Sequence, residues 1–117
     1  MAGRFEIDPL KLVNELERLG KALAQKRHEA NILDKKSKIV LGRIASTLRP
    51  MLGSHSAAMA EATASKEYEA YVDKLCAAEF ATDLAETEYE KHKTYIDLLR
   101  SVNATNREQL KHLSMTP

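Results

Sequence analysis

Apolar residues recur every three or four positions along the C-terminal half of the chain. The pattern runs from Tyr68 to Leu113 without a Pro or Gly. Ten of its fourteen positions are apolar or tyrosine, and the full set is Tyr68, Tyr71, Leu75, Ala78, Thr82, Ala85, Tyr89, His92, Ile96, Leu99, Asn103, Asn106, Leu110 and Leu113. A repeat of 3.5 residues over six heptads is typical of a coiled coil, so the sequence predicts one long helix over residues 66–113. A single apolar seam needs a partner surface to become buried.

A second seam of the same period runs through the N-terminal half. Asp8 followed by Pro9 predicts a helix start, because Asp can cap free backbone N–H groups and Pro at the first position gives up no hydrogen bond. Eight of the next eleven seam positions are apolar, and the full set is Leu12, Leu16, Leu19, Leu23, Lys26, Ala30, Leu33, Ser37, Val40, Ile44 and Thr47. Pro50 lacks an N–H and disfavours helical geometry at Arg49. The first helix is therefore expected to span residues 8–49.

Residues 50–65 separate the two long helices. Gly53 and the serines around it favour a break, and residues 57–64 favour either a short helix or the frayed start of the second arm. Ser65 is placed to cap the second helix. The sequence thus predicts an all-α fold in which residues 1–117 form a single unit, an elongated two-helix hairpin of coiled-coil type with arms roughly 60 Å long at about 1.5 Å per residue.

The position of the fold-back determines which residues of the two arms face each other. For a turn near residue 57, Lys35 is expected opposite Glu79, Arg27 near Glu86 or Thr87, and Lys26 near Glu88. Two helices enclose little volume, so we expect other copies of the chain to complete the seams and form a helical oligomer. The residues expected to carry the hairpin and oligomer contacts are Leu16, Leu23, Leu33, Val40, Ile44, Tyr68, Leu75, Tyr89, Ile96, Leu99 and Leu110.

A net charge near +1 hides a basic half and an acidic half. Residues 1–55 carry a balance of +5, and residues 56–117 carry −4. The lone Cys76 forms no internal disulfide, which fits a reducing, intracellular setting. The chain has no run of 18 apolar residues, and its first ten residues lack the charged-then-apolar order of a signal peptide. We therefore expect a cytoplasmic protein without membrane association.

Five cations of the first helix form a basic stretch, with no acid between Asp34 and Glu61. The stretch consists of Lys35, Lys36, Lys38, Arg43 and Arg49. At 100° per residue these side chains lie on the side opposite the apolar seam, so the sequence predicts an outward cationic face. Such a face can bind nucleic-acid phosphates without sequence preference. The alternative, slightly favoured by composition alone, is that Lys36, Lys38 and Arg43 pair with an acidic stripe of the second arm. This stripe consists of Glu79, Asp83, Glu86 and Glu90.

Candidate catalytic and metal-binding groups are sparse. An acidic stripe on the second helix consists of Glu79, Asp83, Glu86 and Glu90, and a salt-bridged flank of a coiled coil is favoured over a metal site for it. His92 follows Glu88 by four residues, which matches neither the Glu-x-x-His pattern of di-iron bundles nor the His-Glu-x-x-His pattern of zinc proteases. No phosphate-binding Gly loop, Ser/His/Asp set or Cys/His pair appears. We therefore expect no enzyme activity, no catalytic residues, no metal and no cofactor.

The end of the second helix, YIDLLRSVNATNREQL over residues 95–110, resembles a stretch of small helical proteins from bacteriophage recombination modules. The shared pattern consists of Leu99, Arg100, Ser101, Asn103, Ala104, Arg107 and Glu108. The layout upstream is also similar: a basic amphipathic first arm, a variable break, and EYEAYVDKLCAAEFA leading into the long second helix. In these features the chain is similar to the UvsY-type recombination mediators.

That resemblance implies a homo-oligomer that binds single-stranded DNA and helps load a RecA-like recombinase onto strands covered by single-strand-binding protein. For a phage-encoded protein, the implied location is the cytoplasm of the bacterial host. The resemblance makes DNA binding the favoured interpretation of the cationic face, and it assigns no role to Arg100 or Arg107. The alternative, from a different class, is a coiled-coil adaptor, structural component or inhibitor that binds only proteins.

Overall fold

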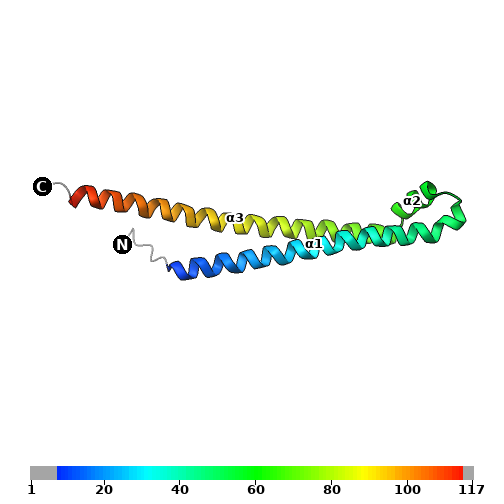
Figure 1. Ribbon diagram of the computed structural model, residues 1–117, viewed down its shortest axis with the longest axis horizontal. Helices are drawn as coiled ribbons and strands as arrows, with labels where there is room; N and C mark the ends of the chain where they lie inside the picture. Colours follow the sequence, from blue (N-terminus) through cyan, green and yellow to red (C-terminus); the bar gives the residue numbers. More distant parts are fainter. Residues whose placement is uncertain (1–7, 115–117) are drawn as a thin grey trace.

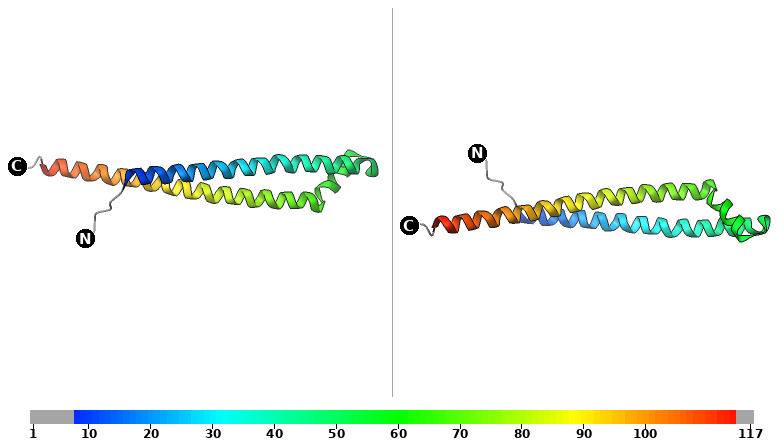
Figure 2. Two further views of the ribbon diagram at one scale, coloured as in Figure 1. Left: turned by 90° about the horizontal axis from the view of Figure 1, so that it is seen from below. Right: turned by 90° about the horizontal axis from the view of Figure 1, so that it is seen from above.

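A computed structural model describes residues 8–114 and shows an elongated hairpin built only of helices in that range (Figure 1). The helices are α1 (Pro9–Leu52), α2 (His55–Thr63) and α3 (Lys66–Ser114). In all views α1 and α3 run antiparallel and side by side, with α2 at the closed end (Figures 1 and 2). The molecule measures 92 × 21 × 19 Å. The prediction of an elongated, all-α hairpin is confirmed.

Capping residues set the two ends of α1. The Asp8 carboxylate accepts a hydrogen bond from the Leu10 N–H at 3.0 Å, as expected. At the other end the helix does not stop at residue 49 but continues through Pro50 to Leu52. Gly53 then adopts a left-handed φ of 75° and its N–H donates to the Arg49 carbonyl at 2.9 Å. Pro50 is tolerated because it lies in the last turn, which this left-handed cap closes.

The short helix α2 is a separate element that packs against α1. Its start is capped by Ser54, whose Oγ accepts a hydrogen bond from the Ala57 N–H at 3.2 Å. Ala58 and Ala62 are fully buried and pack against Ala45 of α1. Methyl side chains at these positions allow the two backbones to approach closely. The alternative in which residues 57–64 form a frayed extension of the second arm is therefore wrong.

The two predicted seams meet along the hairpin. On α1, Leu23 and Val40 are buried, and on α3 the seam positions from Tyr68 to Leu99 are half-buried. The predicted contact residues that are half-buried on α1 are Leu16, Leu33 and Ile44. Those that are half-buried on α3 are Tyr68, Leu75, Tyr89, Ile96 and Leu99. Two helices cover only one side of each other, which explains why few seam residues are fully enclosed.

At the open end of the hairpin, α3 extends beyond α1 (Figures 1 and 2). His92 Nε2 lies 3.1 Å from the carbonyl oxygen of Leu12, close to the start of α1. Residues 100–113, which we call the overhang, are all exposed. Leu110 was expected to lie in the seam, but it is 64% exposed in the single chain. The cause is α2, which occupies the end of α1 and shifts α3 toward the open end.

Candidate nucleic-acid interface

All five cations predicted as a DNA-binding face are exposed and lie on α1. We call them the cationic face: Lys35, Lys36, Lys38, Arg43 and Arg49. The regular geometry of α1 places Lys35 nearly opposite the buried Ser37, which sits in the seam. The Ser37 hydroxyl is satisfied within α1, because it donates to the Asp34 carbonyl at 2.7 Å. The helix thus turns its cations outward and keeps its small buried residues against α3.

Ion pairs divide the cationic face into two groups. The Lys38 ammonium lies 3.3 Å from the Asp34 carboxylate on its own helix, and Arg43 pairs with Glu67 of α3. Lys35, Lys36 and Arg49 make no ion pair with any residue in the 8–114 range. Exposed pairs contribute only about 0–1 kcal/mol. Three of the five cations therefore have no ion-pair partner within residues 8–114, and the other two form only weak ion pairs.

Two of the expected contacts between the arms can be compared directly with the structure. Arg27 lies 3.7 Å from Glu86, as predicted. Lys26 was expected near Glu88 but instead lies 3.7 Å from Glu29 of its own helix. The expected pairing of Lys26 with the second arm is therefore wrong.

The expected pairing of Lys35 with Glu79 is also wrong. Glu79 lines a shallow groove with Arg27 and Asn31, about one helical turn before the predicted position. The hairpin does not fold back near residue 57, because the following residues form α2 and pack on α1. Relative to the predicted register, α3 is therefore displaced along α1 by about one helical turn. Lys35 remains exposed to solvent.

Two isoleucines lie among the cations and were not anticipated. Ile39 is 69% exposed and Ile32 is 38% exposed. Their seven-residue spacing puts both on the outer side of α1 beside Lys35 and Lys36. No aromatic residue lies in this stretch, but the seven-residue spacing of the two isoleucines is visible in the sequence. The surface therefore combines positive charge with aliphatic contact area.

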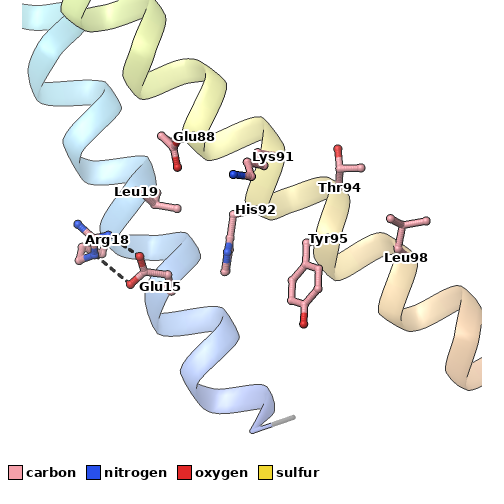
Figure 3. A pocket seen from close by; sticks show the side chains of 9 residues that line it. All are labelled: Glu15, Arg18, Leu19, Glu88, Lys91, His92, Thr94, Tyr95 and Leu98. Carbon is pink, nitrogen blue, oxygen red and sulfur yellow. Dashed lines mark hydrogen bonds and ion pairs between the residues drawn. The ribbon is translucent and has the colours of Figure 1, made fainter. Parts of the chain in front are cut away.

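A second surface feature lies near the open end, where an open groove of about 630 Å³ separates α1 from α3 (Figure 3). Glu15, Arg18 and Leu19 line it from α1, and its α3 side includes Tyr95 and Leu98. Arg18 Nε donates to Glu15 Oε2 at 2.9 Å. This hydrogen bond, more than burial or the nearby charges, holds the pKa of Glu15 below its ordinary value and raises the pKa of Arg18. The groove went unrecognised in the sequence because Tyr95 and Leu98 fall outside the predicted seam.

Neither surface resembles a metal centre. Among residues 8–114, no group of three or more His, Cys, Asp and Glu side chains could hold a metal ion. Cys76 is exposed and has a free thiol. Across the described part of the chain, every helix is too short or too polar to cross a membrane. No protein-family model, curated protein or solved structure matches the chain.

Proposed function

We propose that this protein is a non-enzymatic, self-associating accessory protein of homologous recombination that binds single-stranded DNA through the cationic face of α1. The observation that carries the proposal is the outward position of Lys35, Lys36 and Arg49, which are free of ion pairs within residues 8–114. Such cations can neutralise phosphates and release condensed counterions without first breaking an internal contact.

The length of the cationic face suits a single strand whose bases remain stacked. From Lys35 to Arg49 the helix rises about 21 Å, at about 1.5 Å per residue. At the rise of about 3.4 Å per phosphate that a stacked strand has in a duplex, this length matches roughly six phosphates. Ile32 and Ile39 lie beside the cations and offer aliphatic surface to sugars and bases. A groove specific for one base is not needed for such contacts, so the proposed binding is independent of sequence.

Self-association would raise the affinity of a face that is weak in one copy. When several faces bind one strand, the later contacts are intramolecular and avidity exceeds the affinity of each site. The resemblance to UvsY-type mediators supports this arrangement and suggests a RecA-like recombinase or single-strand-binding protein as partner. The acidic stripe of α3 offers a surface for such a protein. The proposed location is the cytoplasm, in a bacterial host for a phage-encoded protein.

Binding of fluorescently labelled oligo-dT, followed by anisotropy over a range of salt concentrations, tests this function. We expect binding at low salt that weakens steeply toward moderate salt, because the contacts are with phosphates. Duplex DNA of the same length serves as the comparison for strand preference. The absence of oligo-dT binding even at low salt would contradict the proposal.

The second candidate is a coiled-coil adaptor that binds only proteins. Large apolar side chains on the outer side of α3 favour it, since Phe80 is 65% exposed and Leu84 is 53% exposed. Contiguous apolar surface of this kind often marks a protein interaction site. The oligo-dT titration separates the two candidates, because an adaptor would show no salt-dependent binding to the strand.

A further inference from the structure

One side of α3 carries exposed apolar residues along much of its length. Their exposed fractions range from 45% to 71%, and the residues are Phe80, Leu84, Tyr95, Leu98, Val102, Leu110 and Leu113. At 100° per residue they fall within about one third of the helix circumference. We call this set the α3 stripe. It begins beside α1, includes the groove residues Tyr95 and Leu98 (Figure 3), and continues into the overhang.

We propose that a second copy of this chain covers the α3 stripe, with the two α3 helices antiparallel and centred near residue 97. The overhang of each copy then lies along α3 of the other copy and over its groove. This inference specifies the self-association that is part of the proposed function. It does not depend on DNA binding.

The first reason is a set of eight positions on this side of α3 whose spacing reads the same in both directions. The set contains four residues of the α3 stripe, Leu84, Tyr95, Val102 and Leu110. It also contains Glu88 and Asn106, together with His92 and Leu99, which are half-buried at the seam with α1 as well. Successive positions 84, 88, 92, 95, 99, 102, 106 and 110 are separated by 4, 4, 3, 4, 3, 4 and 4 residues. An antiparallel copy centred at residue 97 therefore matches every position with another. The facing pairs are Leu84 with Leu110, Tyr95 with Leu99, His92 with Val102, and Glu88 with Asn106.

The second reason is charge. Residues 79–90 contain five acids and no Lys or Arg, whereas the overhang contains three Lys and Arg against one acid. The antiparallel arrangement sets most of the overhang against this acidic segment, and Arg107 comes next to Glu88 of the other copy. A parallel arrangement would instead place the two acidic segments side by side. Opposite charges across an interface favour the encounter and fix its register.

The third reason is the overhang itself. The overhang continues α3 past the start of α1, so α1 does not cover its apolar side chains. Val102, Leu110 and Leu113 are each more than half exposed there. A second copy buries all three, so dimerisation would stabilise a segment that the single hairpin leaves uncovered.

Spin labels distinguish the two orientations in the full-length protein. In a Cys76→Ser background, Arg100→Cys and Glu108→Cys each introduce one label site on the side of α3 away from the stripe. In the antiparallel dimer, the axial separation between symmetry-related labels is about 9 Å at residue 100 and about 33 Å at residue 108, at about 1.5 Å per residue. Pulsed dipolar spectroscopy should therefore give a clearly longer distance for Glu108→Cys. Equal distances at the two sites, or no dipolar signal, would overturn the proposal.

A charge exchange tests the register. Arg107→Glu and Glu88→Arg should each raise the dimer dissociation constant by at least about tenfold, because each creates a like-charge contact. The double variant should recover the wild-type value in sedimentation equilibrium. Lys93→Glu, a matched charge reversal on another side of α3, should have little effect. Failure of the double variant to recover dimerisation would overturn this register.

Oligo-dT binding separates this inference from the proposed function. A weakened dimer that still binds oligo-dT through Lys35 and Lys36, with reduced avidity, is the expected behaviour of Arg107→Glu. A wild-type protein that is dimeric but does not bind oligo-dT would overturn the proposed DNA-binding function and support the proposed dimer. A wild-type protein that is monomeric at every concentration and binds oligo-dT would overturn the dimer alone.

Discussion

Replacing Lys35, Lys36 and Arg49 together by Ala is expected to reduce the slope of log affinity for oligo-dT against log salt by about 2. Each phosphate contact with single-stranded DNA contributes about 0.7 to this slope. The affinity itself should fall by about tenfold to hundredfold at moderate salt, because three counterion-releasing contacts are lost. Anisotropy titrations at four or more salt concentrations measure both quantities. Circular dichroism of the variant verifies that the helices are retained.

The matched control uses the other two members of the cationic face. Lys38 and Arg43 already contact Asp34 and Glu67, so their replacement by Ala should lower the slope less for each charge removed. An unchanged slope in the triple variant would show that these cations do not contact phosphates. Equal changes per charge in the two variants would contradict the division of the face into free and paired cations.

Leu23→Ala is expected to lower the free energy of unfolding by about 2–3 kcal/mol. Leu23 is 5% exposed and is the largest buried side chain of the α1 seam. Its truncation removes apolar burial and leaves a cavity between two long helices, for which costs of about 2–5 kcal/mol are typical. We expect the low end of this range because solvent reaches both sides of a two-helix seam. Urea denaturation followed by circular dichroism measures the change.

Leu10→Ala provides the comparison within the same helix. Leu10 is 67% exposed, so its truncation should change the free energy of unfolding by less than about 0.5 kcal/mol. Similar losses for both variants would mean that burial along α1 does not follow the seam. A negligible loss for Leu23→Ala would contradict the packing of α1 against α3.

The long helices could be predicted because their apolar period is local in sequence. Asp8 and Ser65 were recognised as caps for the same reason, and the Tyr68 N–H indeed donates to Ser65 Oγ at 3.3 Å. The end of α1 was placed three residues too early because the left-handed cap at Gly53 outweighs the local effect of Pro50. Helix boundaries thus follow the cap more closely than the first unfavourable residue.

The register of the hairpin could not be predicted because it depends on tertiary packing. Residues 57–64 have helix-forming composition, but only the contact of Ala58 and Ala62 with α1 makes them a docked helix. The docking of α2 sets the register of α3 against α1, and this register determines which cations of α1 lie close to acids of α3. The composition of the cationic face was therefore predictable, whereas the pairing of Arg43 with Glu67 was not.

The α3 stripe escaped prediction for another reason. The 3.5-residue repeat predicts one seam along α3, and Leu84, Leu98 and Val102 lie outside that seam. Their exposure becomes significant only once α1 is known to end before the overhang. A second apolar pattern on a long helix is therefore informative when the first is already satisfied by an intramolecular partner.

The claim that the outer side of α1 contacts the strand is tested most directly by photo-crosslinking from the protein. A photoreactive amino acid in place of Ile39 lies among the cations, and the same group in place of Phe80 lies on the outer side of α3. Irradiation with labelled oligo-dT should crosslink the Ile39 variant and leave the Phe80 variant largely unmodified. Crosslinking from position 80 with none from position 39 would contradict the account.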